Sequence, residues 1–214
     1  SSLGDNSGNG GKILLEANNN ISVETIVTSS SKNSGNIDIN TKAGSFSLKN
    51  SSISTNPIKD GNAGSINIKA PSIKLTQSDI SSSASGTGDS GNITLNSAGN
   101  IELNNSRLFT TIEPGATGEG GNIDITTQKL QLEKYSLINT GTYSSGNAGN
   151  VDINAQEISL NNSSSILSLT SDAGKAGNIN LDVTGNVALT NNSNISTAST
   201  SNSKVDSAII NIKS

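Results

Sequence analysis

Three aspartates, Asp38, Asp124 and Asp152, share one place in a recurring hexapeptide that begins with Gly, Asn and an aliphatic residue. Paired carboxylates can act as general acid, general base or nucleophile, for example when a glycosidic bond is cleaved. The repeats in between carry Asn67 and Thr94 at this place, so only Asp124 and Asp152 are expected in adjacent repeats. Two neighbouring outward carboxylates are more typical of a solvated surface. We therefore predict no catalytic residue and no enzyme.

Metal chemistry has few candidate ligands in this chain. The sequence contains no Cys and no His, so thiolate and imidazole sites cannot be built, and no disulfide forms. Calcium needs several oxygen ligands together, but the loop acids come singly in each repeat, and the Gly-Gly-x-Gly-x-Asp pattern of the calcium-binding β-roll is missing. These loop acids are Asp60, Asp89, Glu113, Glu119 and Asp172. We predict no metal site and no cofactor, although calcium binding by a single loop stays open.

Threonines recur near the end of the repeats, and a flat face of threonine rows would indicate ice binding. They are Thr55, Thr110, Thr140 and Thr197. Serine replaces threonine in other repeats, and we expect these hydroxyls to point inward at a corner, where they can bond to turn backbone. Ice binding is therefore not predicted.

Composition alone would favour disorder. Hydrophobic residues make up 30% of the 214 residues and aromatic residues 2%, and such chains bury little apolar surface. The regular placement of the apolar residues argues against disorder, because a disordered chain needs no such register. The net charge of −4 is mild, and the lysines are not clustered as nucleic-acid binding requires. No apolar stretch is long enough to span a membrane, so neither nucleic acid nor a membrane span is expected.

The hexapeptide marks an internal repeat. Its copies begin at Gly11, Gly35, Gly64, Gly91, Gly121, Gly149, Gly177 and, more weakly, Ala208, at intervals of 24 to 31 residues. A period of this size indicates a solenoid of stacked units. We predict a polar lead-in over residues 1–10 and a single β-solenoid over residues 11–214, with about seven coils of roughly 28 residues.

Each repeat contains three strand-like segments in which aliphatic and polar residues alternate. Alternation with a period of two is typical of a strand with one buried face. In the repeat that starts at Gly35, the inward residues include Ile37, Phe46 and Ile53, one from each segment. In the first repeat, the pattern Thr-x-Val-x-Ser predicts Val27 as the inward residue of the third segment.

Stacking would pair each segment with its counterparts above and below, about 4.8 Å away. The aliphatic residues would then form continuous internal columns. The glycine before the asparagine fits a turn position with φ > 0, which glycine adopts at little cost. The asparagines at the same place in successive coils can form a hydrogen-bonded ladder. The loops of variable length, which hold Pro57 and Pro114, should all emerge along one edge.

The repeats resemble those of filamentous-haemagglutinin-like exoproteins, in particular the cyanobacterial S-layer-family type secreted by the two-partner route. The resemblance is carried by GNAGSINIKAPSIKLTQSDISSSASGTGDSGNITL at 61–95 and GEGGNIDITTQKLQLEKYSLINT at 118–140. It extends over nearly the whole chain from Gly11. It implies a right-handed parallel β-helix, an extracellular or bacterial cell-surface location, and a role as an adhesin or fibre.

Two hypotheses about function follow. The first is a structural and adhesive stalk of a secreted exoprotein, whose partner is a surface glycan or another cell-surface component. The alternative is a filament, sheath or S-layer subunit that stacks head to tail, because the last segment presents apolar Ile210 and Ile212 without a cap. In both cases we expect the chain to be a segment of a longer chain or fibre.

Overall fold

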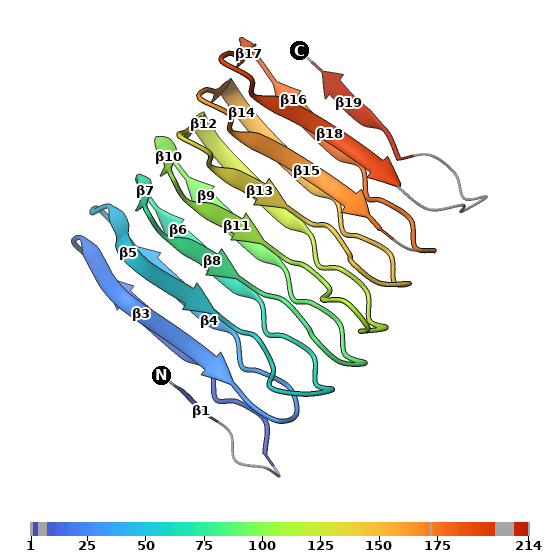
Figure 1. Cartoon of the computed structure of the whole chain (residues 1–214). Helices are drawn as coiled ribbons and strands as arrows, with labels where there is room; N and C mark the ends of the chain where they lie inside the picture. Colours follow the sequence, from blue (N-terminus) through green and yellow to red (C-terminus); the bar gives the residue numbers. More distant parts are fainter. Residues whose placement is uncertain (1, 4–7, 172, 200–207, 214) are drawn as a thin grey trace.

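The computed structural model describes residues 2–3, 8–171, 173–199 and 208–213. Every strand pair in these ranges is parallel, and the strands stack along one axis into about seven coils, about 28 residues apart. Figure 1 shows the stack from its N-terminal end in blue to its C-terminal end in red. The predicted all-β solenoid is therefore confirmed.

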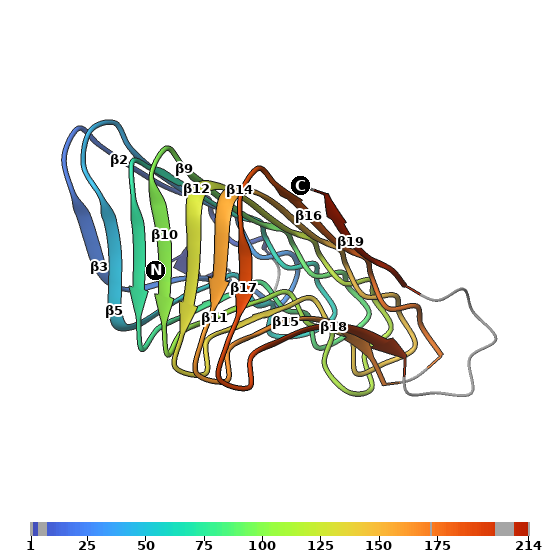
Figure 2. The ribbon, with the colours of Figure 1, turned by 90° about the horizontal axis from the view of Figure 1, so that it is seen from above.

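The strands form three columns, each built from successive coils (Figure 2). The first column holds β2 (Ile13–Ala17), β4 (Ile37–Thr41), β6 (Ile66–Ala70), β9 (Ile93–Ser97), the first parts of β12 (Ile123–Glu133) and β14 (Val151–Leu160), β16 (Ile179–Val183) and β19 (Ile210–Lys213). The second holds the first parts of β3 (Ile21–Ser29) and β5 (Phe46–Ser54), β7 (Ile73–Thr76), β10 (Asn100–Asn104), the second parts of β12 and β14, and β17 (Val187–Leu189). The third holds β1 (Ser2–Leu3), the second parts of β3 and β5, β8 (Asp79–Ser81), β11 (Arg107–Phe109), β13 (Leu137–Asn139), β15 (Ser165–Thr170) and β18 (Asn194–Ser199).

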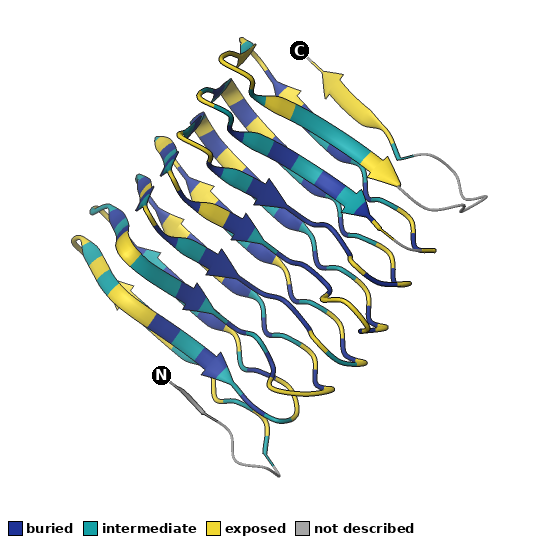
Figure 3. Cartoon of the chain, in the orientation of Figure 1, coloured by how far each residue is buried: buried dark blue, intermediate teal, exposed yellow. Residues whose placement is uncertain are grey.

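The core lies between the columns, as the alternation predicts. Ile37, Phe46 and Ile53 are each 0% exposed and belong to one cluster that runs through the stack. Buried and exposed residues alternate along β6 and its neighbours, which Figure 3 shows as bands of dark blue and yellow. The terminal coils have a neighbour on one side only, and Leu189 of β17 is accordingly 42% exposed.

The first coil departs from the predicted register. Ile26, not Val27, pairs with Ile53 and enters the core, and the register of β3 against β5 shifts between Val23 and Thr25. A shift of one residue turns a strand's side chains to the opposite face. The prediction of Val27 as the inward residue was wrong because this corner has fewer residues than the corresponding corners of later coils.

The corner between the second and third columns has a left-handed backbone. Among the described residues, the coils from β5 onward place one or two non-glycine residues there with φ between 48° and 63°. The residues are Asn50, Gln77, Asn105, Lys134, Tyr135, Asn162, Ser163, Asn191 and Asn192. Asparagine tolerates this region better than most residues, which explains its frequency at the corner.

The repeat glycines have a different reason from the one predicted. Among the described glycines only Gly115 has a φ in the left-handed region, so the prediction of φ > 0 for the glycine before asparagine was wrong. A Cβ on Gly149 would instead lie 2.0 Å from the carbonyl oxygen of Gly121 in the preceding coil. These glycines are needed because consecutive coils approach too closely for any side chain.

The predicted asparagine ladder is present and has a definite form, which we name the Gly-Asn ladder. The backbone N–H of each member donates to the side-chain oxygen of the member one coil earlier, at 2.8–3.3 Å. Its members are Asn36, Ser65, Asn92, Asn122, Asn150, Asn178 and Ile209. These bonds satisfy backbone donors at the turn, where strand pairing is interrupted.

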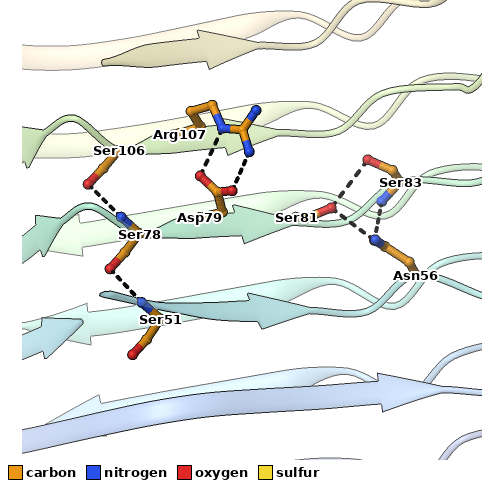
Figure 4. A network of polar contacts seen from close by, with 8 residues as sticks. All are labelled: Ser51, Asn56, Ser78, Asp79, Ser81, Ser83, Ser106 and Arg107. Carbon is orange, nitrogen blue, oxygen red and sulfur yellow. Dashed lines mark hydrogen bonds and ion pairs between the residues drawn. The ribbon is translucent and has the colours of Figure 1, made fainter. Parts of the chain in front are cut away.

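Serine hydroxyls brace the opposite corner in the same way. Ser51 N donates to Ser78 Oγ and Ser78 N to Ser106 Oγ, at 3.2 and 3.1 Å (Figure 4). The hydroxyl of Ser78 in turn donates to the carbonyl oxygen of Thr76 at 2.8 Å. Ser78 therefore makes hydrogen bonds both within its own corner and to the neighbouring coils.

The loops project along one edge, at the lower right of Figure 1. They carry a small apolar cluster of their own, formed by Ala84, Ile112 and Ala116. The described residues of the lead-in also bond to the stack, since β1 pairs with β3 and Gly10 N donates to Asn33 O at 2.8 Å. No helix that could cross a membrane occurs in the described part of the chain.

Candidate functional site

Asp38 lies on the outer face of the first column and is fully engaged. Its carboxylate accepts from Lys12 Nζ at 2.6 Å and from Asn67 Nδ2 at 2.7 Å. These hydrogen bonds, that of Lys12 first, hold the pKa of Asp38 below its usual value. The arrangement stabilises the charged carboxylate and does not produce a proton donor.

Asp124 and Asp152 are brought together as predicted, directly opposite each other on β12 and β14. Asp152 accepts from Asn180 Nδ2 at 2.7 Å. Burial, and secondarily the charge of Asp152, raises the pKa of Asp124. The pair borders a shallow hollow of about 210 Å³ that Asp182 also lines. Two carboxyl groups in unlike surroundings could divide the roles of acid and base.

Asp182 adds a third acidic side chain to the hollow beside the acid pair. Across the residues that the structure describes, no three His, Cys, Asp or Glu side chains gather closely enough to hold a metal ion. The other residues that line the hollow are Ile125, Thr126, Ile153, Asn154 and Asn180. Asp124 and Asp152 therefore lie on a polar outer surface.

Three of the loop acids considered for calcium, Asp60, Asp89 and Glu119, accept hydrogen bonds from the next coil. Asp89 accepts from the backbone N–H of Glu119 at 2.8 Å, and Glu119 accepts from that of Asn147 at 3.0 Å. Asp60 accepts from Thr87 N at 3.3 Å, and Glu113 from Thr111 Oγ1 at 3.4 Å. Asp172 lies outside the described residues.

The recurring threonines point inward, as predicted. Thr55, Thr110 and Thr140 are each 0% exposed. Each donates its hydroxyl hydrogen to the carbonyl oxygen of the glycine that begins the next repeat. Thr197, in the last coil, is partly exposed and donates to Ala208 O at 3.4 Å. These threonines therefore close the coil and present no outer row.

Arg107 lies on the outer face of the third column. Its guanidinium donates with two nitrogens to both carboxylate oxygens of Asp79 (Figure 4). The guanidinium also lies over the ring of Phe109, 5.4 Å from its centre. The hydrogen bonds that Arg107 donates to Asp79 raise the pKa of Arg107. This bidentate pair joins two consecutive coils.

Sequence reasoning missed a groove on the outer face of the second column. A hollow of about 620 Å³ lies over β7, β10 and β12. Its side chains include Lys74, Glu102 and Gln131 from three consecutive coils, and one wall consists of the corner residues Gln77, Asn105, Lys134. A second hollow, of about 420 Å³, shares Lys74 and Glu102 with the first. We call the two together the second-column groove.

The polar areas of the described outer surface therefore include the acid pair on the first column and the second-column groove. The sequence signal for the groove was weak, because it consists of outward polar residues about 28 positions apart. Comparison of the chain with models of protein families, with curated proteins and with solved structures found no match.

Proposed function

We propose that this chain is a structural and adhesive stalk segment of a secreted bacterial surface exoprotein. The observation that carries the proposal is the continuity of the core and of the hydrogen-bonded ladders through successive coils. A stalk has to transmit force along its axis without local weak points. The resemblance of the repeats to filamentous-haemagglutinin-like exoproteins supports the surface location.

The distribution of side chains suits this role. The aliphatic residues are used in the internal columns, and the outer faces carry mainly Asn, Ser, Thr, Lys and acidic side chains. Because each coil contacts only its neighbours, coils can be added without changing the cross-section. About seven coils at roughly 4.8 Å each extend about 35 Å along the axis. The adhesive contacts would come from the outer faces and the loops.

Two experiments test this proposal. In single-molecule pulling between two handles, the chain should resist and then lengthen in multiples of one coil, about 100 Å for about 28 residues. An antibody against the chain should label intact cells of the native organism, and external protease should remove the signal. Labelling that requires cell lysis would contradict the surface location, and smooth extension without steps would contradict the stalk.

A second candidate is a filament subunit that stacks end to end. The specific observation is the last described coil, in which Ile209, Ile210 and Ile212 are 57%, 42% and 51% exposed. Light scattering of the purified chain over a range of concentrations would show fibre growth, which Ile210→Lys with Ile212→Lys should abolish. A monodisperse monomer at all concentrations would leave the stalk as the better proposal.

A further inference from the structure

We infer that the second-column groove binds a neutral polysaccharide chain. The inference deepens the adhesive part of the proposed function and rests on it, since it names the surface that makes the adhesive contact and the class of ligand. Four properties of the groove carry it: its shape and extent, its unpaired amides, the strained corner that forms one wall, and its balanced charge.

The groove crosses the second column obliquely. One end lies at Ser45 and Ser47 of the second coil, and the other at Glu133 and Lys134 three coils further along. Three coil steps extend about 14 Å along the axis, and the strands add a similar distance across it. This length accommodates an extended chain of several sugar rings. The ion pair of Lys74 with Glu102, at 2.9 Å, lies where the two hollows meet.

The amides of the groove are free to bind a ligand. In the described part of the chain, the side chains of Gln77, Asn105 and Gln131 make no hydrogen bond to other residues, whereas the outward amide of Asn67 is bonded to Asp38. An amide presents two donors and an acceptor. Such groups match the hydroxyl groups of sugars, which both donate and accept.

The corner at the edge of the groove holds a strained pair of residues, the first of which, Lys134, lines the groove. Lys134 and Tyr135 have φ of 53° and 63°, a region in which a bulky residue such as tyrosine is a genuine outlier. The same corner in the next two coils holds Asn162–Ser163 and Asn191–Asn192, and asparagine and serine cost less there. Strain of this kind persists where a side chain is needed. Lys134 lines the groove, and Tyr135 beside it is 72% exposed.

Tyr135 and Lys134 add an apolar ring face and a charged donor to the amides of the groove. A tyrosine ring offers an apolar face with a polar tip, and a sugar ring has apolar C–H faces that can pack on it. In the described residues no ion pair joins Lys134 to a carboxylate. Its ammonium group can donate up to three hydrogen bonds to ligand oxygens.

Charge and backbone pairing select the ligand class. The lining contains Lys74 and Lys134 against Glu102 and Glu133, so neither an acidic nor a basic polymer gains net attraction. A peptide cannot add as a strand here, because the strands under the groove are paired on both sides within the stack. No apolar pocket for a peptide side chain is present among the lining residues. Of the polymer classes considered as ligands, a neutral polysaccharide rich in hydroxyl groups fits the groove best.

The test is affinity electrophoresis of the 214-residue chain in gels that contain one soluble neutral polysaccharide each, such as a β-glucan, a xylan, a mannan or a dextran. At least one should retard the chain. Lys134→Asn with Tyr135→Ser gives this corner the residues of the next coil, so it removes both side chains and also relieves the strain. Retardation should weaken by about tenfold or more, while the thermal midpoint should stay the same or rise.

The matched control is Tyr143→Ser, which removes an exposed tyrosine from a loop of the same coil that does not line the groove. Its retardation should equal that of the parent chain. No retardation by any neutral polysaccharide would overturn the inference, as would equal weakening by both variants or retardation by a polyanion alone. Pulling experiments on the same samples separate the two proposals. If stepwise unfolding persists without binding, only the groove inference fails.

Discussion

Gly149→Ala should destabilise the solenoid strongly although it adds a single methyl group. The new Cβ would lie 2.0 Å from Gly121 O and 2.5 Å from Gly121 C, so the two coils must separate by about 1 Å to restore ordinary contacts. That displacement acts on hydrogen bonds to Gly149 O from Thr140 Oγ1 at 2.6 Å and from Ser168 Oγ at 3.1 Å. The ladder bond from Asn150 N at 2.8 Å is also affected. At about 1 kcal/mol each, the loss is about 3 kcal/mol.

Urea denaturation followed by circular dichroism would measure this loss as a lower midpoint. Substitution by asparagine at two glycines provides the informative comparison, because asparagine tolerates φ > 0. Gly115 has φ of 83° with nothing within 4 Å of its Cβ position, so Gly115→Asn should change the free energy of unfolding by less than about 1 kcal/mol. Gly149→Asn should be at least as damaging as Gly149→Ala. If Gly149→Ala cost less than about 0.5 kcal/mol, or if asparagine rescued it, close stacking would not be the reason for these glycines.

Further predictions concern the core and the outer acids. Ile125→Asp buries a charge in a column where Ile125 is 1% exposed, and should cost about 5 kcal/mol or more and unfold several coils; retention of slow amide exchange along β12 would contradict this. The pKa of Asp38 is lowered, so its stabilising effect is present above the ordinary value of 3.8 and is lost as pH falls through the still lower folded-state value. Asp38→Asn should therefore lower the melting temperature slightly at neutral pH and leave it unchanged in strong acid. The pKa of Asp124 is raised, so the penalty is absent well below 3.8 and appears as pH rises through the folded-state value; Asp124→Asn should raise the melting temperature at neutral pH only, and no rise would mean that the carboxylate is well solvated. Finally, we expect no turnover of common polysaccharides, and product release that disappears in Asp124→Asn with Asp152→Asn would show that the acid pair is catalytic.

The alternation of aliphatic residues predicted most of the side chains that form the core. It works because strand side chains alternate strictly, so that Ile37, Phe46 and Ile53 have only one face available. The same rule could not give the length of each corner. In the first coil the corner is shorter, so Ile26 and not Val27 points inward. The number of residues in a turn decides which residues of the next strand face the core.

The candidate sites were predicted less completely. Register placed Asp124 beside Asp152, because the repeat itself aligns them. The second-column groove depends on which outward side chains from three coils lie next to one another, and on a corner conformation that the sequence shows only indirectly. Asparagines at Asn50, Asn105 and Asn162 were the available sign of a left-handed corner. Lys134 and Tyr135 are the one pair at this corner that contains no asparagine among the described residues.

The low hydrophobicity of the chain and two of the single acids in its loops have one common explanation. A second ladder runs parallel to the Gly-Asn ladder, three residues earlier in the chain. In it, the backbone N–H of one coil donates to a side-chain oxygen of the coil before. The accepting residues are Asn33, Asn62, Asp89, Glu119 and Asn147. The ladder requires one acceptor oxygen in each coil and does not distinguish an amide from a carboxylate. Two of the loop acids, Asp89 and Glu119, therefore occur singly, one in each coil, at positions where other coils have asparagine. Because backbone donors at the turns are satisfied by side chains repeated in every coil, order extends into segments that bury little apolar surface, and a chain with 30% hydrophobic residues can fold.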